Sequence, residues 1–318
     1  MNIALDMMGG DFAPLEAVKG VFTYLSETSN PAQLLLIGDK SQIEKHLENG
    51  AELPSACKII HASQHIEMEE HPTKALKEKQ HSSIALGFQL LASGEADAFI
   101  SAGNTGAMLV GALLSIKPIE GITRPTIGTY LPREDGNLGL LLDAGINADC
   151  KPENLCQFAL LGSLFAKHVW NIQIPKVGLL NIGEEEGKGN ILAQATYPLL
   201  KENKQINFVG NVEGRDIFSD KADIIVCEGF TGNVILKMAE GIHDIIKRRN
   251  INDPYFERFE FGQYGGVPVL GVNKPVIVGH GISREDSFKN MIGLAEKIIE
   301  SDLPGKIRNS FRQENADD

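Results

Sequence analysis

The chain has 318 residues, a length that suits one large α/β unit or two smaller ones. Hydrophobic residues make up 42% and charged residues 23%, values that exclude disordered, coiled-coil and collagen-like classes. The 30 Lys and Arg against 42 Asp and Glu give a net charge of −12, so no nucleic-acid partner is expected. The four cysteines form no CxxC pair, and no apolar run approaches the ~20 residues of a bilayer span. A reduced, cytoplasmic protein without a signal peptide is expected.

Short apolar runs alternate with longer helical patterns along the whole chain. Nine runs are predicted strands: 3–5, 34–37, 58–61, 98–101, 138–142, 177–182, 207–209, 223–226 and 276–278. Most are continuously apolar, which is typical of strands buried on both faces of a parallel sheet. The pattern therefore predicts an α/β fold with three layers (α/β/α) and a mostly parallel sheet.

Helices are predicted between these strands, over 41–48, 152–166 and the apolar stripe of 288–299, which is expected to be the last helix. Residues 1–310 are expected to form a single catalytic α/β unit, with two lobes around a cleft as the alternative. Residues 121–136 are then the expected crossing between lobes. The polar residues 311–318 are expected to form a frayed tail.

Glycine and asparagine follow many of the predicted strands, at the sheet edge where α/β proteins bind ligands. The runs are 6–11, 101–106, 183–190, 210–216, 229–233 and 279–281. Glycine lets backbone N–H groups approach a ligand, and a helix start adds positive potential. Together the loops predict a polar cleft for an anion such as phosphate. The chain has no GxxxxGK[ST], GxSxG or HExxH pattern, and no GxGxxG follows the first strand, so no nucleotide cofactor or metal is expected.

Lys188 and His280 each have two interpretations, whereas one is expected for Cys227 and one for the pair His61 and His65. Lys188 lies between glycines after three glutamates, so it is either a solvated surface residue or an oxyanion contact. His280 is either a ligand contact or structural. Cys227 ends a buried strand and is expected to be a core thiol. His61 and His65 are read as surface histidines rather than a metal pair.

In this order the loops resemble the PlsX family of phosphate acyltransferases over about residues 1–300. The matching runs are Ile3–Asp6, Met8–Asp11, Pro14, Ser82-Ser83, Ser101–Gly106, Arg124-Pro125, Leu141–Asp143, Gly145, Asn147, Val177–Glu185, Lys188–Asn190, Gly210–Asp216, Gly229–Asn233, Tyr264–Gly266 and His280-Gly281. The resemblance implies an architecture similar to phosphotransacetylases and isocitrate/isopropylmalate dehydrogenases, in a homodimer. It also implies reversible transfer of a long-chain acyl group from acyl carrier protein to inorganic phosphate. The acyl phosphate would feed a membrane glycerol-3-phosphate acyltransferase in phospholipid synthesis, so a peripheral membrane location is included in the expectation.

The resemblance also suggests which residues act. Lys188 and Asn233 are the predicted catalytic pair, a point charge and an amide donor for the phosphate or oxyanion. Asn104, Thr105 and Gly106 are predicted to cradle phosphate at a helix start. The remaining candidates for substrate binding are Asn181, Glu213, Arg215 and His280.

Three features qualify the resemblance. Ile146 stands where the family usually has Ala, and Ile282 where it has Ser, which removes one hydroxyl. The segment 241–264 is shorter than the family's helical insert, although Lys247–Arg249 remain as a basic stretch. An acidic carrier protein needs a positive patch, for which Lys74, Lys77 and Lys79, or Lys247–Arg249, are the candidates.

Three other activities stay open from the sequence. A phosphotransacetylase-like enzyme acting on acyl-CoA is the nearest. An oxidoreductase of the isocitrate or isopropylmalate type is suggested by fold alone, and the sequence lacks its cluster of Asp ligands. The third is a non-enzymatic lipid-binding or scaffold protein, which would have no use for a phosphate site.

Overall fold

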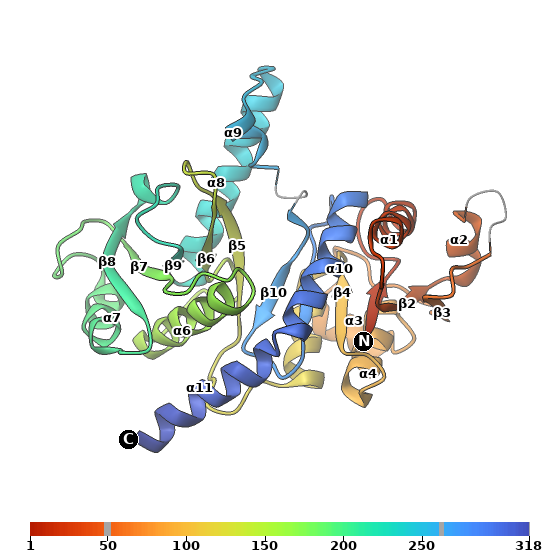
Figure 1. Cartoon of the computed structure of the whole chain (residues 1–318), viewed down its shortest axis with the longest axis horizontal. Helices are drawn as coiled ribbons and strands as arrows, with labels where there is room; N and C mark the ends of the chain where they lie inside the picture. The colour runs from red at the N-terminus through yellow and green to blue at the C-terminus, as the bar shows by residue number, and fades with distance from the viewer. Residues whose placement is uncertain (48–51, 261–263, 318) are drawn as a thin grey trace. The chain divides into compact units, whose positions relative to one another are not determined.

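A computed structural model describes residues 1–47, 52–260 and 264–317. The chain divides into two compact units (Figure 1). Unit 1 comprises Met1–Ile119 and Phe261–Pro304, and unit 2 comprises Glu120–Glu260 and Gly305–Asp318. The first boundary falls just before the expected crossing at 121–136, much of which is strand β5 (Thr126–Pro132).

Unit 1 is built on a sheet with the strand order β3-β2-β1-β4-β11-β10. The bounds are β1 (Asn2–Asp6), β2 (Gln33–Gly38), β3 (Cys57–His61), β4 (Ala98–Ser101), β10 (Val267–Leu270) and β11 (Val276–Val278). Neighbours pair in parallel except β10, which runs antiparallel to β11. Because β1 and β4 are parallel neighbours, the loops that follow them, which begin at Asp6 and Ser101, emerge at the same sheet edge.

Helices cover the sheet of unit 1. Their bounds are α1 (Leu15–Glu27), α2 (Lys40–Lys45), α3 (Pro72–Glu78), α4 (Ser83–Ser93), α5 (Thr105–Gly111), the π-helix Ala112–Ile116 and α10 (Glu285–Glu300). Helices α1 and α10 pack together, and Gly20 makes this possible because a Cβ there would lie 2.5 Å from that of Phe288. Helix α4 packs on the strands through Phe88, whose ring lies 5.0 Å from that of Phe99 on β4. The helix predicted over 41–48 begins one residue earlier and ends at Lys45, and Glu48 lies outside the described residues.

Unit 2 has the strand order β5-β6-β9-β7-β8. The bounds are β5 (Thr126–Pro132), β6 (Leu138–Leu142), β7 (Lys176–Asn181), β8 (Asn207–Glu213) and β9 (Ile224–Val226). Only β5 is antiparallel to its neighbour β6. The carboxyl ends of β6, β7, β8 and β9 therefore share one edge, where Asp143, Asn181, Glu213 and Cys227 lie.

Helices lie on both faces of this second sheet. The bounds are α6 (Pro152–His168), α7 (Ile191–Glu202), the 3-10 turn Gly214–Asp216, α8 (Gly229–Arg248) and α9 (Pro254–Glu257). Helix α6 comes close at Gly162, where a Cβ would meet Leu142 and Ile224. On the opposite face Leu141 and Ile225 belong to a core cluster against which Ile235 of α8 packs. Alternate residues of a strand point to opposite faces, so unit 2 has the three layers that the sequence predicts.

All nine predicted strands are confirmed, and the mostly parallel α/β fold with them. Two strands, β5 and β10, were not predicted, and both are the antiparallel members of their sheets. The prediction for β8 was too short. Its chain passes Gly210 at φ +94 and continues as strand to Glu213, with Val212 fully buried.

The carboxyl-terminal prediction was wrong in two respects. Helix α10 is followed by α11 (Leu303–Asp317), so the stripe of 288–299 is not on the last helix. The segment from 311 is helical instead of frayed up to Asp317. Leu303, Ile307 and Phe311 recur at intervals of four residues and are each 2% exposed, which gives α11 a buried face. Among the described residues, no helix is both long and apolar enough to cross a membrane.

Candidate active site

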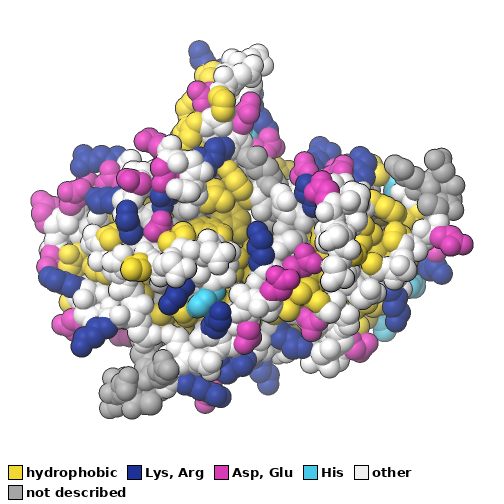
Figure 2. Space-filling view, viewed as in Figure 1, with side chains coloured by type: hydrophobic (Ala, Val, Ile, Leu, Met, Phe, Trp, Pro, Cys, Tyr) yellow, Lys and Arg dark blue, Asp and Glu magenta, His cyan; other side chains and the backbone are white. Residues whose placement is uncertain are grey.

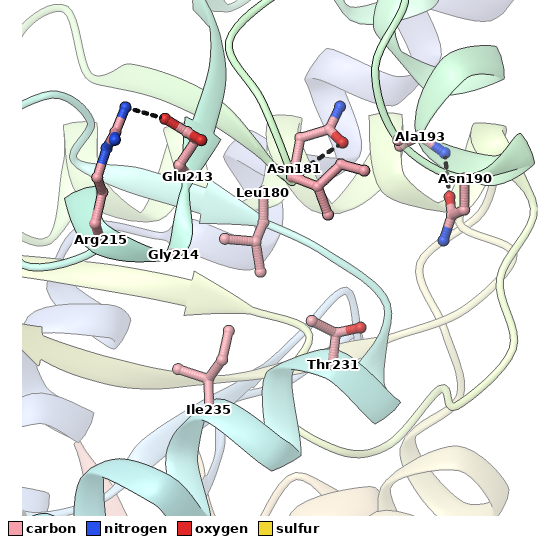
Figure 3. A pocket seen from close by; sticks show the side chains of 11 residues that line it. Leu180, Asn181, Asn190, Ala193, Glu213, Gly214, Arg215, Thr231 and Ile235 are labelled. Atoms are coloured by element: carbon pink, nitrogen blue, oxygen red, sulfur yellow. Dashed lines mark hydrogen bonds and ion pairs between the residues drawn. The ribbon is translucent and has the colours of Figure 1, made fainter.

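A pocket of about 840 Å³ opens in unit 2 at the carboxyl edge of its sheet (Figure 3). The ends of β7 and β8, the loop before α7, and the first two turns of α8 form its walls. The volume lies within the ~300–1,000 Å³ range of small-molecule sites. The topology therefore places a ligand-sized pocket where an α/β sheet usually has one.

Aliphatic side chains form much of the wall. They are Leu180, Ile182, Ala193 and Ile235. In Figure 3, Leu180 on β7 and Ile235 on α8 point toward each other across the space. Both also pack against the core cluster of the unit, so this part of the pocket is a continuation of the core.

Two asparagines fix the loop that borders the pocket. Asn181 accepts a hydrogen bond from the Ile182 N–H at 2.8 Å and donates to the Lys188 carbonyl at 3.1 Å. Asn190 caps α7 by accepting from the Ala193 N–H at 2.8 Å, as N-cap asparagines do. Gly189, between them, has φ +100, and a Cβ there would lie 2.3 Å from Asn181 Oδ1. Only glycine fits this position, which explains part of the sequence motif.

Lys188 is exposed on this loop, next to the pocket residues Gly189 and Asn190. Its Nζ lies 4.0 Å from Glu185 Oε1, a long contact between two exposed side chains. Such a pair contributes about 1 kcal/mol or less, so the ammonium group is accessible to an anion.

Asn233 lies on the second turn of α8, which is a helix where the sequence analysis expected the loop 229–233. Glu228 caps this helix by accepting from the Thr231 N–H at 2.8 Å. Asn233 is exposed and donates to the Ala144 carbonyl at 3.4 Å. A Cβ on Gly145, at φ +134, would come within 2.9 Å of Asn233 Nδ2. The loop after β6 therefore sets the position of this amide.

Asp143 organises that loop. Its carboxylate is fully buried and accepts from the N–H groups of Gly145 at 2.7 Å, Ile146 at 2.8 Å and Asn147 at 3.2 Å. The Asn147 carbonyl in turn accepts from the Gly229 N–H at 2.8 Å, at the start of α8. Burial raises the pKa of Asp143, although these hydrogen bonds act in the opposite direction.

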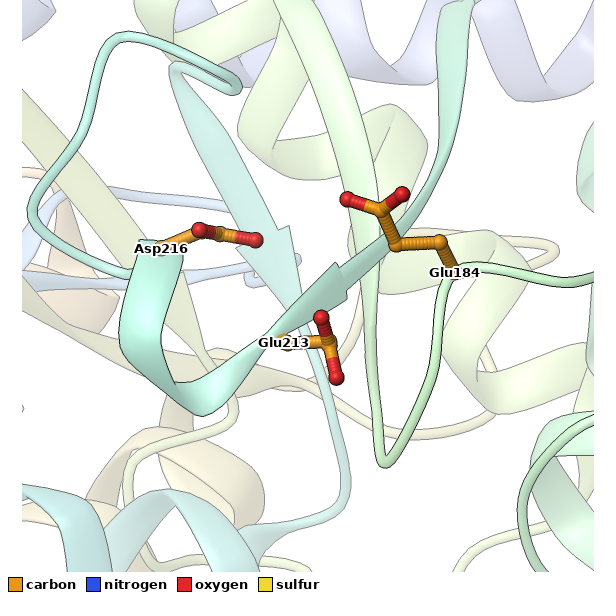
Figure 4. A group of neighbouring side chains, drawn as sticks. All are labelled: Glu184, Glu213 and Asp216. Atoms are coloured by element: carbon orange, nitrogen blue, oxygen red, sulfur yellow. The ribbon is translucent and has the colours of Figure 1, made fainter.

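Glu213 and Arg215 line the pocket and form an ion pair with each other. Glu213 also belongs to a group of three carboxylates with Glu184 and Asp216, whose oxygens lie within 4.8 Å of one another (Figure 4). Lys221 Nζ lies 2.7 Å from Glu184 and 3.2 Å from Asp216. Ion pairs within the chain therefore account for the group, and we assign no metal to it.

The other predicted site residues belong to unit 1. Asn104 is the N-cap of α5, accepting from the Ala107 N–H at 2.9 Å. Its amide nitrogen donates to the carbonyls of Glu67, Met68 and Glu70 at 3.0 to 3.1 Å. The side chain, 4% exposed, thus connects two loops. Thr105 and Gly106 form the first turn of α5, and His280 is exposed after β11.

Asp6 is the unit 1 counterpart of Asp143. Its carboxylate, 1% exposed, accepts from the Met8 N–H at 2.9 Å and from Ser101 Oγ at 2.6 Å. Ser101 Oγ accepts from the Gly103 N–H at 2.9 Å, so Asp6 is linked to the loop that follows β4. Burial raises the pKa of Asp6. Neither Asp6 nor Asp143 is among the predicted site residues, although a Leu-Asp pair ends an apolar run in both places.

The cysteine and histidine predictions can be compared with the structure. Cys227 is 5% exposed within the core cluster, and burial raises its pKa, which confirms a core thiol. His61 Nδ1 accepts from the Lys40 N–H at 3.2 Å, and His65 pairs with Glu67 at 2.7 Å.

The fold resembles solved phosphotransacylases. A phosphotransacetylase from Streptococcus pyogenes superimposes with a TM-score of 0.67 at 19% identity, covering 94% of both chains. A branched-chain phosphotransacylase from Enterococcus faecalis gives 0.62 at 16% identity, covering 94% of this chain and 99% of the other. At these identities the likeness concerns the fold, which confirms the predicted architecture.

Sequence comparison establishes the family. The model of the family described as "Fatty acid synthesis protein" matches residues 1–250. A protein from Halothermothrix orenii named phosphate acyltransferase is 44% identical over 338 aligned positions, covering 99% of both chains. One of the same name from Desulforamulus reducens is 43% identical over 334 positions, also with 99% coverage of each. The chain belongs to the fatty acid synthesis protein family, and the resemblance to PlsX enzymes is confirmed.

Proposed function

We propose that this protein transfers a long-chain acyl group from acyl carrier protein to inorganic phosphate, giving acyl phosphate and free carrier. The observation that carries the proposal is the near-complete alignment with relatives named phosphate acyltransferase. The pocket beside Lys188 supports it, because it offers an apolar wall next to an accessible cation.

The reaction needs no covalent enzyme intermediate. A phosphate oxygen forms a bond to the thioester carbonyl carbon, and the carbonyl electrons move onto its oxygen. The tetrahedral intermediate then collapses, the carbon–sulfur bond breaks, and the carrier thiolate takes a proton from solvent. Phosphate is largely dianionic at neutral pH, so the protein has to orient it and stabilise the oxyanion.

Lys188 and Asn233 are the residues we assign to that stabilisation. Lys188 contributes a positive charge from a loop held by Asn181. Asn233 contributes a neutral amide donor whose place is set by the loop of Asp143. In unit 1, the N–H groups of Thr105 and Gly106 are proposed phosphate donors, with Asn104 shaping their turn rather than binding directly. Asn181, Glu213, Arg215 and His280 remain proposed substrate contacts.

Alanine at Lys188 tests the assignment. We expect Lys188→Ala to lower turnover by ~10²-fold or more with little change in thermal stability, because the side chain is exposed and loosely paired. Lys201→Ala is the matched control, since Lys201 is an exposed lysine of unit 2 that pairs with Glu186 at 2.9 Å. Turnover that survives Lys188→Ala would remove Lys188 from the mechanism.

The partners form the second part of the proposal. We infer a homodimer. The support is a stripe of exposed apolar side chains along α8, which a second subunit would shield from water. It consists of Phe230, Val234, Met238, Ile242 and Ile245, which are 46 to 67% exposed. Figure 2 shows hydrophobic side chains among charged ones over the region of α8 and α9.

Positively charged side chains are the proposed contacts for the carrier protein and for the membrane. Lys74 and Lys77 are exposed on α3, whereas Lys79 pairs with Glu70 at 2.6 Å, so the first two are the proposed carrier contacts. Lys247 pairs with Glu260 at 2.5 Å, which leaves Arg248 and Arg249 as the exposed basic residues at the end of α8. We propose that this end contacts an anionic membrane surface, where the product passes to a glycerol-3-phosphate acyltransferase.

A further inference from the structure

The wall of the unit 2 pocket offers mainly aliphatic contacts to a ligand. Every polar side chain that lines it already has a partner within the protein: Asn181, Asn190, Glu213, Arg215 and Thr231. An apolar ligand could therefore lie against the aliphatic part of the wall without breaking any of these bonds.

Several lining residues are themselves exposed and apolar or have an exposed apolar neighbour in the sequence. Ile182, which lines the pocket, is 80% exposed, and Ile191, next to Asn190, is 89% exposed. Phe230 and Val234, at 67% and 52%, precede Thr231 and Ile235 of the pocket wall. Single exposed apolar residues are common, but here three of the four wall segments, at the end of β7 and at the starts of α7 and α8, carry them.

The pocket also adjoins Lys188, one of the two residues assigned to the reaction. Gly189 and Asn190 follow Lys188 directly, and Asn181 binds the Lys188 carbonyl. Asn233 is not among the lining residues: Thr231 and Ile235 are each two residues from it on α8, so its side chain lies on another side of the helix, against the Ala144 carbonyl. A ligand whose carbonyl reaches Lys188 would have the apolar wall of Leu180 and Ile235 next to its chain.

We propose that this pocket, with Leu180, Ile182 and Ile235 as its main apolar contacts, binds the hydrocarbon chain of the acyl substrate and sets the chain-length preference. The inference rests on the proposed transfer reaction and adds the place of the chain to it. Each methylene buried here should strengthen binding by about fourfold, corresponding to ~0.8 kcal/mol.

Filling the pocket tests the inference. Gly214 lines it, and a Cβ added there meets no atom within 4 Å, so Gly214→Phe adds bulk without a backbone clash. Gly293→Phe on α10 is the matched control, because a Cβ is equally unobstructed there and Gly293 does not line the pocket. Ile182→Asp, at an 80% exposed position, is a second variant that changes polarity without removing a buried contact.

The measurement is kcat/KM with palmitoyl and octanoyl carrier protein, using phosphate as acceptor. Both pocket variants should lower the palmitoyl-to-octanoyl ratio by about tenfold or more, and Gly293→Phe should leave it at the wild-type value. A wild-type ratio in both pocket variants overturns the inference and leaves the transfer reaction standing. A wild-type protein that forms no acyl phosphate overturns the proposed function, and the inference with it.

A photoreactive diazirine analogue of palmitoyl carrier protein gives a readout that does not depend on turnover. Labelling is expected on peptides that contain 180–193 or 231–235, with loss of label in Gly214→Phe. Labelling that is confined to other peptides would place the chain elsewhere.

Discussion

Asp6 of unit 1 and Asp143 of unit 2 stand at the ends of central strands, each after a leucine, and each carboxylate is buried and accepts backbone N–H groups. The two carboxylates differ in the loops that they stabilise. Asp6 is linked through Ser101 to the loop of a neighbouring strand. Asp143 holds its own loop, and that loop positions the start of α8 and Asn233. The same local motif therefore joins two loops in one unit and orients a candidate catalytic amide in the other.

Removal of either carboxylate should have the largest effect on stability. Asp143→Ala leaves three N–H groups without an acceptor, so we expect a loss of about 3 kcal/mol or more in the free energy of unfolding. Asp6→Ala removes the acceptor of the Met8 N–H and of the Ser101 hydroxyl, which can rotate to another partner, so a smaller loss of about 2 kcal/mol is expected. Urea unfolding measures both, and an equal or larger loss for Asp6→Ala would contradict this ranking.

A smaller change tests the link to Asn233. Gly145→Ala adds a Cβ 2.9 Å from Asn233 Nδ2, so turnover should fall by about tenfold or more as the amide is displaced. Gly136→Ala is the control, because Gly136 has φ +88 but its Cβ would meet nothing within 4 Å. Both variants carry backbone strain of about 1 kcal/mol or more. Equal turnover in the two would show that the loop does not position Asn233.

The smallest expected effect is a difference in the pH dependence of stability between an ion-paired carboxylate and two buried ones. Arg133 lowers the pKa of Asp135 through their ion pair, so its contribution is present above the unfolded pKa and lost as pH falls. Burial raises the pKa of Asp6 and Asp143, so their contributions are present at low pH and decline as pH rises through the folded pKa. Below about pH 4, the melting temperature of Asp135→Asn should fall less steeply with decreasing pH than that of the wild type. If the melting temperatures of the two proteins fall equally with pH in this range, the ion pair between Arg133 and Asp135 does not contribute as proposed.

Much of the fold followed from the sequence because parallel strands buried on both faces are continuously apolar. Strand β5 contains Gly128 and ends at Pro132, and β10 contains Pro268, so neither resembles such a run. The motif at 229–233 is rich in glycine and suggested a loop, but the cap supplied by Glu228 makes it a helix. That cap depends on a side-chain geometry that composition does not reveal.

The candidate site was only partly predictable. Asn181, Glu213 and Arg215 do share one pocket, and Lys188 adjoins it. The interior wall of Leu180 and Ile235 could not be inferred, because both look like ordinary core residues until β7 and α8 are placed together. Asn104 was predicted from its motif as a phosphate ligand, whereas its amide is occupied by three carbonyls and a helix cap.

The most direct test of the proposed function is acyl phosphate formation by the full chain from palmitoyl carrier protein and phosphate, run beside palmitoyl-CoA. The account predicts product from the carrier thioester and little from the CoA thioester. Product chiefly from palmitoyl-CoA would identify a phosphotransacetylase-like enzyme instead. A folded protein that forms no product from either would contradict the account and favour a lipid-binding or scaffold role.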